Sequence, residues 1–311
     1  MIIALTGGLG NQLFQVAACL YATTNDKAEV LTNLAAPRST NNIVDVLHFD
    51  LDEHLLINNQ KFHSIDSKIF GFNLRQGISP TNLEEIVILR KISQLATSLY
   101  FSFRLKKKIS VYSANNVGYS NIENLVENTL LVGYFQTNKF LLNEKVLTKL
   151  KKIKLLDEKQ QFLKLKKDAE IERPIVVHMR LGDYLKFDKF GVLGTNYYER
   201  SLDRIYEMRK TQKNNIWVFS DDTELARNKF PKKYEEDVCW IENEGSSPAQ
   251  VLDLMRHGTD FVLANSSFSW WSAMLAYKPN IVVAPSKWFL AMEDPLHLKP
   301  KYWFQENPYF D

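Results

Sequence analysis

The sequence predicts an α/β protein with two domains that share a cleft. First, its 311 residues are about twice the usual domain length of roughly 100 to 200 residues. Second, the chain opens with MIIALTGGLGNQLFQVAACLYATTN, in which a short apolar run, a glycine turn and a helical pattern form one βα unit. Third, short β-branched runs alternate with helical patterns beyond residue 170, which is typical of βαβ units with a parallel sheet.

The first half of the chain carries few clear patterns. The opening helix is expected from Leu13 to Tyr21, whereas residues 26–80 contain no element that can be assigned. Apolar residues alternate with basic ones from Leu83 to Lys108, which indicates a helix with a basic surface. The run 128–135 is typical of a strand, and a charged helical stretch follows from Leu141 to Lys167.

The second half is patterned throughout, so we place the domain boundary near residue 170 and expect domains at 1–169 and 170–311. Apolar types make up 45% of the chain, enough for a sizeable core in each. The expected strands and helices follow one another as PIVVHMR, NYYERSLDRIYEMRK, NIWVFSDD, a helix from Thr223, AQVLDLMRHG, DFVLANSS, FSWWSAMLAY and NIVVAPS.

Composition and charge exclude several classes of protein. With 39 Lys and Arg against 36 Asp and Glu, the formal charge of +3 is too balanced for a protein that neutralises nucleic-acid phosphates over a large face. Cys19 and Cys239 stand far apart, which predicts neither a disulfide framework nor a zinc site. No signal peptide precedes the glycine turn, and no apolar run approaches the roughly 18 to 20 residues of a membrane span. We therefore expect a cytosolic protein whose partner is small or uncharged.

The basic segment 89–108 has two interpretations. The ordinary one is a solvated helix face. The sharper one is a patch that rests on anionic lipid at the inner face of the plasma membrane, or that approaches a lipid-linked acceptor.

Ligands of open α/β sheets bind at the carboxyl ends of the strands, so we examine the residues that follow each apolar run. After the first run, Gly8 allows close approach of a ligand to the backbone, and Asn11 and Gln12 offer amide donors and acceptors. A plain turn is the alternative. A dehydrogenase would use a similar loop, but no acidic residue follows a clear second strand to hold a ribose.

The run PIVV leads into His178, Arg180 and Asp183. Alternation along a strand puts His178 and Arg180 on the same side, and a guanidinium at a strand end suits a diphosphate because it is permanently charged and binds two oxygens. The alternative is a surface pair of Arg180 with Asp183 beside a structural histidine.

The next strand ends in Asp221 and Asp222, just before a helix. One of the two is expected to cap that helix, and the other could hold ribose hydroxyls or a base edge. Adjacent acids on a continuing strand point to opposite faces, so a metal site ranks lower.

The last segment of interest is ANSSFSWWSAML, where a strand end is followed by Asn265, Ser266 and Ser267 and then by a helix. Exposed N–H groups and hydroxyls at a helix start form an anion site, although capping alone would also explain these residues. Trp270 and Trp271 are expected in the core. Together with Arg180, this segment favours a ligand that carries phosphate.

The motifs GGLGNQLFQ, HMRLGDY, FSDD and NSSFSWW together resemble the α-1,2-fucosyltransferase family in order and spacing, over positions 7–272. The resemblance implies a GT-B type fold of two Rossmann-like domains, with the donor in the second and the acceptor beside the first. It implies GDP-fucose as donor, an inverting reaction, and no requirement for a metal or other cofactor. The family often has a second arginine after the first, and here that position is Leu181.

The resemblance also assigns roles to residues. Arg180 is expected to contact the β-phosphate, the region of Ser266 and Ser267 to bind the same diphosphate, and His178 to lie close to the nucleotide. An acid for the guanine edge is expected as Asp253, slightly displaced from its usual place. The donor-binding set is thus Gly8, Asn11, Gln12, Arg180, Asp221, Asp222, Asp253, Asn265, Ser266, Ser267 and Phe268.

We hypothesise a single displacement in which a galactose O2 attacks the anomeric carbon of GDP-β-L-fucose. Arg180 and the helix N–H groups would stabilise the charge on the leaving diphosphate. Asp183 is our first choice for the general base, with Asp188 and His178 as alternatives. The acceptor is expected to be a galactose-terminated oligosaccharide, free or lipid-linked.

Three other interpretations stay open. Tyr206 and Lys210 have the YxxxK spacing of a short-chain dehydrogenase, where the lysine would lower the pKa of the tyrosine. The chain could instead be a noncatalytic nucleotide-binding module, or a related transferase with a different donor or acceptor.

Overall fold

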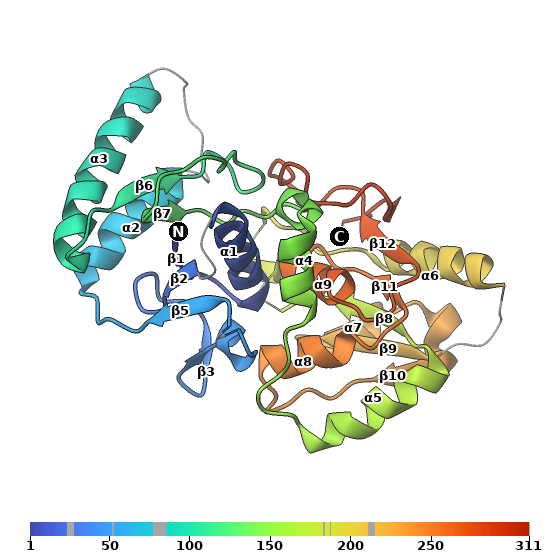
Figure 1. The fold of residues 1–311 in the computed structure, drawn as a ribbon. Coiled ribbons are helices and arrows are strands. Elements are labelled where there is room, and N and C mark those ends of the chain that lie inside the picture. The colour runs from blue at the N-terminus through green and yellow to red at the C-terminus, as the bar shows by residue number, and fades with distance from the viewer. Residues whose placement is uncertain are drawn as a thin grey trace. The chain divides into compact units, whose positions relative to one another are not determined.

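A computed structural model describes residues 1–23, 28–51, 53–76, 85–182, 184–186, 188–210 and 215–310. The chain forms two compact units, which Figure 1 shows in blue to green and in green to red. Unit 1 is Met1–Lys154 with Pro295–Leu298, and unit 2 is Leu155–Asp294 with Lys299–Asp311. The division thus falls after Lys154 and not near residue 170. The reason is that helix α5 (Gln160–Glu172) packs against α8 (Pro248–Met255) of unit 2.

Unit 1 contains a five-stranded parallel sheet in the order β5-β2-β1-β7-β6. These strands span Leu55–Asn58, Ala28–Leu31, Ile2–Ala4, Thr129–Val132 and Ser110–Ser113, and a separate antiparallel pair is formed by β3 (Ser39–Thr40) and β4 (Ile43–Val44). Strands β2 and β5 lie in the region where the sequence allowed no assignment.

Helices cover the sheet of unit 1. Phe70 of α2 and Phe101 of α3 are buried with strand residues such as Ile2 and Leu130. The predicted helices around 13–21 and 83–108 are confirmed as α1 and α3. The helical elements are α1 (Leu9–Ala22), η1 (Asp45–His48), α2 (Ser64–Gln76), α3 (Glu85–Leu105), η2 (Lys139–Leu142) and α4 (Glu144–Lys151).

Unit 2 contains a six-stranded, fully parallel sheet in the order β10-β9-β8-β11-β12-β13. Strands β8, β9, β11 and β12 correspond to runs expected from the sequence, whereas β10 and β13 were not expected. In sheet order, the six strands span Val238–Trp240, Ile216–Ser220, Ile175–Met179, Asp260–Val262, Val282–Pro285 and Phe304–Glu306.

The crossovers of unit 2 place helices against the sheet. Tyr197 and Leu202 of α6 pack with Ile175 and Val177 of β8 in one apolar cluster. Trp270 and Trp271 of α9 are fully buried, as predicted. Beyond α5 and α8, the helical elements are η3 (Tyr184–Lys186), α6 (Thr195–Arg209), α7 (Thr223–Lys229), η4 (Lys232–Asp237) and α9 (Ser267–Met274).

The two parallel-sheet units confirm the predicted α/β class and the two Rossmann-like domains. In the part of the chain that the structure describes, no helix has both the length and the apolar character needed to cross a bilayer.

Candidate functional site

The candidate site lies at the carboxyl ends of β8 and β11. From β8 the chain proceeds to β9 and β10 on one side, and it then returns to β11 on the other side. Loops that leave β8 and β11 therefore diverge, and such a topological switch point is where ligands of open α/β sheets bind. The predicted residue Arg180 directly follows β8, and Asn265 lies three residues beyond the end of β11.

Arg180 forms an ion pair with Asp221 across the ends of β8 and β9. Arg180 Nη1 lies 3.3 Å from Asp221 Oδ2, and Asp221 Oδ1 accepts a hydrogen bond of 2.8 Å from the backbone N–H of Leu181. The two side chains keep 21% and 23% of their surface exposed, so a ligand can still reach the guanidinium. A Cβ at Gly182 would lie 3.1 Å from Asp221 Oδ2, and glycine therefore allows this close approach.

The adjacent residues Asp221 and Asp222 make different contacts. Asp222 caps α7 by accepting a 3.0 Å hydrogen bond from the N–H of Leu225, which is the capping role expected for one of the pair. Asp221, expected to hold a ribose or a base edge, instead has both carboxylate oxygens engaged by Arg180 and Leu181. The local structure therefore supports Asp221 as the counter-ion of Arg180.

His178 is buried on β8 and packs against Phe268 at the start of α9, with 5.6 Å between ring centroids. Burial, aided by the nearby charge of Arg180 and opposed by Asp221, lowers the pKa of His178 from 6.5 to about 4. The imidazole is thus neutral near pH 7. Its Nδ1 has no hydrogen-bond partner among the described residues. An orphaned buried nitrogen of this kind is expected where a ligand or water completes the bonding.

Asn265 connects the loop after β11 to the loop after β8. Its Nδ2 donates to the carbonyl oxygens of Phe190 (3.1 Å) and Gly191 (3.0 Å). The backbone carbonyl oxygen of Asn265 accepts a 3.0 Å hydrogen bond from the hydroxyl of Tyr184. The side chain is fully buried, and its Oδ1 lacks a partner within the described part of the chain.

The start of α9 follows immediately. Ser266 is the N-cap, and its hydroxyl accepts a 3.3 Å hydrogen bond from the N–H of Phe268. Capping therefore explains Ser266 in part. In general, the first N–H groups of an α-helix have no intrahelical acceptor, and this property makes helix starts bind anions.

Tyr184 is a site residue that the sequence analysis missed. The Arg180 Cζ lies 5.7 Å from the centroid of its ring, and its hydroxyl reaches Asn265. Phe190 packs beside it, with 5.0 Å between centroids. The only sequence signal was the position of Tyr184 at the end of HMRLGDY. Through Tyr184 on one side and His178 on the other, Arg180 is linked to the loop that begins α9.

The predicted residues of unit 1 follow β1, which is paired with β7 in the sheet. Gly7 has φ of +73°, which favours glycine, and Gly8 is the N-cap of α1. Gln12, predicted to bind the donor, is fully buried. Its Nε2 donates to the carbonyls of Gly7 (2.9 Å) and Arg38 (3.1 Å), and its Oε1 accepts from Val46 N (2.9 Å). Gln12 is thus engaged in holding the glycine turn.

Asn11 keeps part of its surface exposed and lies beside a residue that the sequence did not reveal. Its Oδ1 accepts a 2.8 Å hydrogen bond from Nε2 of Gln136, which follows β7. Gln15, another missed residue, is buried and bonds Thr6 N at 2.9 Å and the carbonyl of Gly133 at 3.2 Å. These amides join the ends of β1 and β7.

Asp253, predicted for the guanine edge, is buried within α8. One carboxylate oxygen is 2.6 Å from Lys166 Nζ, and the other is 3.1 Å from Arg256 Nη1. Both oxygens are therefore engaged by cations. The reason is that Asp253 is turned toward α5, which carries Lys166, and this arrangement does not support contact with a nucleotide.

Asp183, predicted as the general base, lies outside the described residues. Asp188, its alternative, is an exposed turn residue. Tyr206 and Lys210, which have the YxxxK spacing of a short-chain dehydrogenase, make separate structural contacts. The Tyr206 hydroxyl donates a hydrogen bond to Asp237 at 3.1 Å, and Lys210 is the C-cap of α6 with φ of +54°. Among the described residues, no group of three or more His, Cys, Asp or Glu side chains is arranged to hold a metal ion.

Comparison with known proteins gives consistent relatives. The family model described as glycosyl transferase family 11 matches residues 1–300. The O-antigen biosynthesis glycosyltransferase WbnK of Escherichia coli is 28% identical, with 93% of this chain and 95% of that protein covered. An alpha-1,2-colitosyltransferase of Escherichia coli is 27% identical, with 93% and 92% covered. The crystal structure of NodZ alpha-1,6-fucosyltransferase soaked with GDP-fucose has a TM-score of 0.47 at 12% identity, with 88% and 92% covered.

Proposed function

Because the chain belongs to glycosyl transferase family 11, we propose that it transfers L-fucose from GDP-β-L-fucose to O2 of a terminal galactose. Membership confirms the resemblance drawn from the four motifs, and the chain is a glycosyltransferase that uses a nucleotide-sugar donor and a glycan acceptor. The fucose donor, the galactose acceptor, the inversion and the independence from metal are our proposal. The name of one relative, an O-antigen biosynthesis glycosyltransferase, supports a role in the synthesis of a bacterial O-antigen.

The observation that carries the proposal is the surroundings of Arg180. A guanidinium that keeps a fifth of its surface exposed stands at the switch point of the sheet, and Tyr184 beside it bonds the backbone carbonyl of Asn265 just before α9. His178, whose pKa the charge of Arg180 helps to lower, packs against Phe268 of α9. A guanidinium binds two phosphate oxygens at once, and helix-start N–H groups add neutral donors. These features together suit a nucleoside diphosphate.

The buried polar atoms of the site support the same ligand. His178 Nδ1 and Asn265 Oδ1 are without partners among the residues that the structure describes. A neutral imidazole can donate or accept one hydrogen bond, and the amide oxygen can accept one, so they would contact the hydroxyl and oxygen groups of a nucleotide sugar. Such pairing would recover the free energy that burial of these atoms costs.

In the reaction, the acceptor hydroxyl oxygen forms a bond to C1 of fucose while the bond from C1 to the phosphate oxygen breaks. GDP departs with the electron pair, the hydroxyl proton passes to a base, and the β-linked donor gives an α-linked product. Arg180 would stabilise the charge that develops on the diphosphate, a task that a metal ion performs in other transferases. Asp183 stays our predicted base, and Asp188 is the alternative.

The proposal extends to the acceptor glycan and to the cellular location of the transfer reaction. The role of unit 1 in acceptor binding stays a prediction, for which Asn11 and Gln136 are the candidate contacts. We further propose that the acceptor is lipid-linked and that transfer takes place at the cytoplasmic face of a membrane, in keeping with the O-antigen relative.

The direct test incubates the protein with GDP-fucose and a panel of galactose-terminated oligosaccharides, followed by linkage analysis of the products. We expect an α-1,2-linked fucosyl product, and we expect the same rate in EDTA. Absence of transfer to every galactoside, or a product linked elsewhere, would contradict the acceptor assignment. A loss of activity in EDTA that divalent cations restore would contradict metal independence.

The colitosyltransferase relative favours a second candidate, a donor whose sugar lacks the fucose 3-hydroxyl. A site built to bind a hydroxyl can reject the deoxy analogue by about 10⁴-fold or more, whereas a site without such contacts accepts both. Competition between GDP-fucose and GDP-colitose at equal concentrations therefore identifies the donor. Predominant colitosyl product would replace the fucosyltransferase assignment and leave the diphosphate site intact.

A further inference from the structure

Helix α3 carries a row of large apolar side chains on its solvent face. Ile92, Leu95, Leu99 and Phe103 are 59%, 63%, 67% and 82% exposed. Their spacing of three, four and four residues puts them on one side of an α-helix. Single exposed apolar residues are common on proteins, but a contiguous row marks a surface that meets something apolar. We call this row the α3 stripe.

The α3 stripe is not needed to hold α3 in place. The opposite side of the helix supplies the core contacts, since Phe101 is fully buried and Thr97 is 3% exposed. Polar contacts also join α3 to α2. Arg104 Nε lies 2.9 Å from Oδ1 of the buried Asp66, and the Tyr100 hydroxyl donates to that oxygen at 2.8 Å. The two helices thus form a fixed platform with the stripe on its outside.

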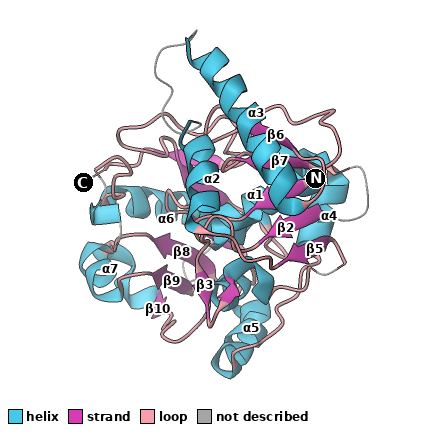
Figure 2. Cartoon of the chain, turned by 90° about the vertical axis from the view of Figure 1, so that its left-hand side faces the viewer, coloured by secondary structure: helices cyan, strands magenta, loops and turns pink. Residues whose placement is uncertain are grey.

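Helix α2 extends the apolar surface. Ile65 and Phe72 are 51% and 53% exposed, and their spacing of seven residues puts them on one side of α2. The helices run antiparallel, because Asp66 near the start of α2 contacts Arg104 near the end of α3, while Asn73 contacts Thr97 at 2.9 Å. Figure 2 looks onto this side of the molecule, where α2 and α3 lie side by side.

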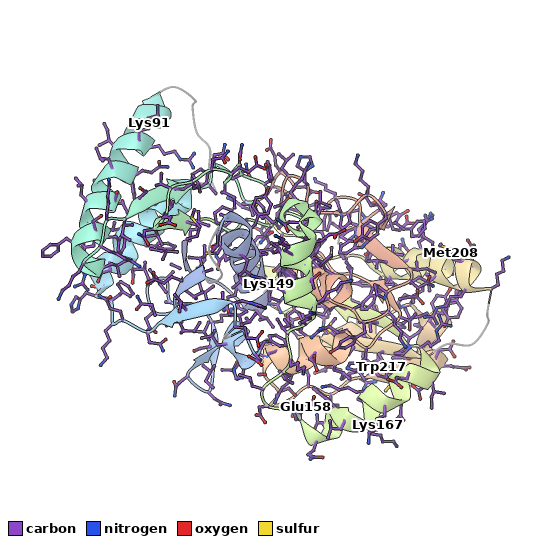
Figure 3. The ribbon with its side chains drawn as sticks, viewed as in Figure 1. Lys91, Lys149, Glu158, Lys167, Met208 and Trp217 are labelled. Carbon is purple, nitrogen blue, oxygen red and sulfur yellow. The ribbon has the colours of Figure 1, made fainter. Side chains whose placement is uncertain are left out.

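The charges around this surface have one sign. Among the described side chains of 61–75 and 90–108, the only acidic one is Asp66, which is buried against Arg104. Lys91 stands near the N-terminal end of α3 (Figure 3). The exposed charged residues are Lys61, Lys68, Arg75, Lys91, Lys106 and Lys108, all basic. This asymmetry contrasts with the near balance of the whole chain at +3.

We propose that the outer surface of α2 and α3 docks on a lipid bilayer that contains anionic lipids. Helices at a membrane interface combine a row of Phe, Leu or Ile with flanking lysines, and the apolar side chains enter the boundary between headgroups and acyl chains by about 5 to 10 Å. The lysine stems lie along the apolar layer while their ammonium groups reach lipid phosphates. This inference rests on α2 and α3 alone and does not depend on the transfer reaction.

Charge selects this occupant over the alternatives. A second copy of the chain that met this surface face to face would bring two basic rims together, which repel each other. Single-stranded nucleic acid needs aromatic planes for stacking, and the stripe offers Phe103 among aliphatic side chains. An anionic bilayer satisfies both the apolar row and the basic rim.

The test measures cosedimentation of the full chain with two kinds of vesicle, phosphatidylcholine alone and equal parts of phosphatidylcholine and phosphatidylglycerol. We expect binding to the anionic vesicles at least about 10-fold tighter than to neutral ones, weakened by salt. The triple variant L95Q/L99Q/F103Q should lose about 10-fold or more in affinity for anionic vesicles. The variant K91Q/K106Q/K108Q should lose the preference for anionic lipid.

The matched control is L142Q/L156Q/I171Q, which removes three apolar side chains that are 69%, 65% and 86% exposed elsewhere on the chain. It should bind vesicles as the parent does. All variants should keep the parent's Tm and its affinity for GDP in solution, which separates this proposal from the transferase assignment. Equal binding of the parent to both vesicles, an unchanged stripe variant, or a parent dimer that the stripe variant converts to monomer would overturn the proposal.

Discussion

The two units share a plan and differ in what they do with their polar groups. Each contains a parallel sheet with polar residues beyond two neighbouring strands, β1 and β7 in unit 1 and β8 and β11 in unit 2. Because ligands of such sheets bind at the carboxyl ends of the strands, both places are candidates for a ligand site.

In unit 1 the amides near this point bond to the protein. Gln12 makes three hydrogen bonds, Gln15 joins β1 to the end of β7, and Gln136 donates to Asn11. In unit 2 the described residues leave His178 Nδ1 and Asn265 Oδ1 without partners. The difference indicates that the amides beside β1 and β7 serve the fold, whereas His178 and Asn265 leave buried polar atoms that a ligand could satisfy.

The largest effect is expected from Arg180→Ala. Loss of the guanidinium removes the main charge that stabilises the leaving diphosphate, so turnover should fall by roughly 100-fold or more. Steady-state transfer kinetics measure this. The control Arg200→Ala removes an exposed arginine of α6 that lies over Tyr309, and it should keep normal turnover. Near-normal turnover in Arg180→Ala would refute the placement of the diphosphate in unit 2.

The pH dependence of stability gives the second effect. The folded state lowers the pKa of His178 from 6.5 to about 4, so the unfolded chain binds the proton first as the pH falls. The stability contributed by a neutral His178 is complete above about pH 6.5 and is lost as the pH falls toward 4. The full loss is on the order of 3 kcal/mol at about 1.4 kcal/mol per pKa unit.

Urea unfolding of the parent and of His178→Gln between pH 7 and pH 4.5 isolates this contribution, because glutamine does not titrate. The variant should lose less free energy of unfolding over this range than the parent does. Parallel losses in both proteins would mean that His178 is not held neutral by burial beside Arg180.

Gln12→Ala tests whether the buried amide of Gln12 in unit 1 serves the stability of the fold and not the binding of the donor. The variant removes the acceptor of Val46 N and one of two hydrogen bonds at each of the carbonyls of Gly7 and Arg38, which should cost about 1 to 3 kcal/mol of stability. Because unit 2 keeps its site, the Kd for GDP measured by calorimetry should not change. A large loss of GDP affinity at normal Tm would restore the original prediction that Gln12 contacts the donor.

Much of this fold could be predicted because strands buried in parallel sheets are continuous apolar runs. The runs at β8, β9 and β11 identified the strands and, with them, the positions of Arg180, Asp221 and Asn265. Strands β2 and β5 and helix α2 escaped prediction, since they are short or have no marked apolar face. Their positions depend on tertiary pairing with β1 and on the buried Asp66.

The roles of individual polar residues were harder to predict, because a partner remote in sequence decides them. The sequence around Gln12 does not indicate that its side-chain amide bonds to Arg38 and Val46. Likewise, the sequence around Asp253 does not indicate its ion pair with Lys166. Tyr184 has no periodic pattern, yet it joins Arg180 to Asn265. Sequence motifs therefore located the candidate site at the carboxyl ends of β8 and β11. Side-chain contacts were needed to separate residues that could contact a ligand from residues that hold the fold together.

The smallest effect, and the one that distinguishes two roles for the same residue, is expected from Asp221→Asn. Asparagine keeps an oxygen for the N–H of Leu181 but removes the negative charge that would stand beside a bound diphosphate. If Asp221 is only the counter-ion of Arg180, calorimetry should show GDP binding about 3- to 10-fold tighter, as expected for removal of a like charge near the surface.

The matched control is Asp222→Asn, since asparagine is an equally good N-cap for α7 and the Kd for GDP should stay the same. Weaker GDP binding in Asp221→Asn would instead mean that the carboxylate accepts hydrogen bonds from the nucleotide. The originally expected contact with ribose or base would then form on binding, with Arg180 released from Asp221 as the diphosphate takes the place of its counter-ion.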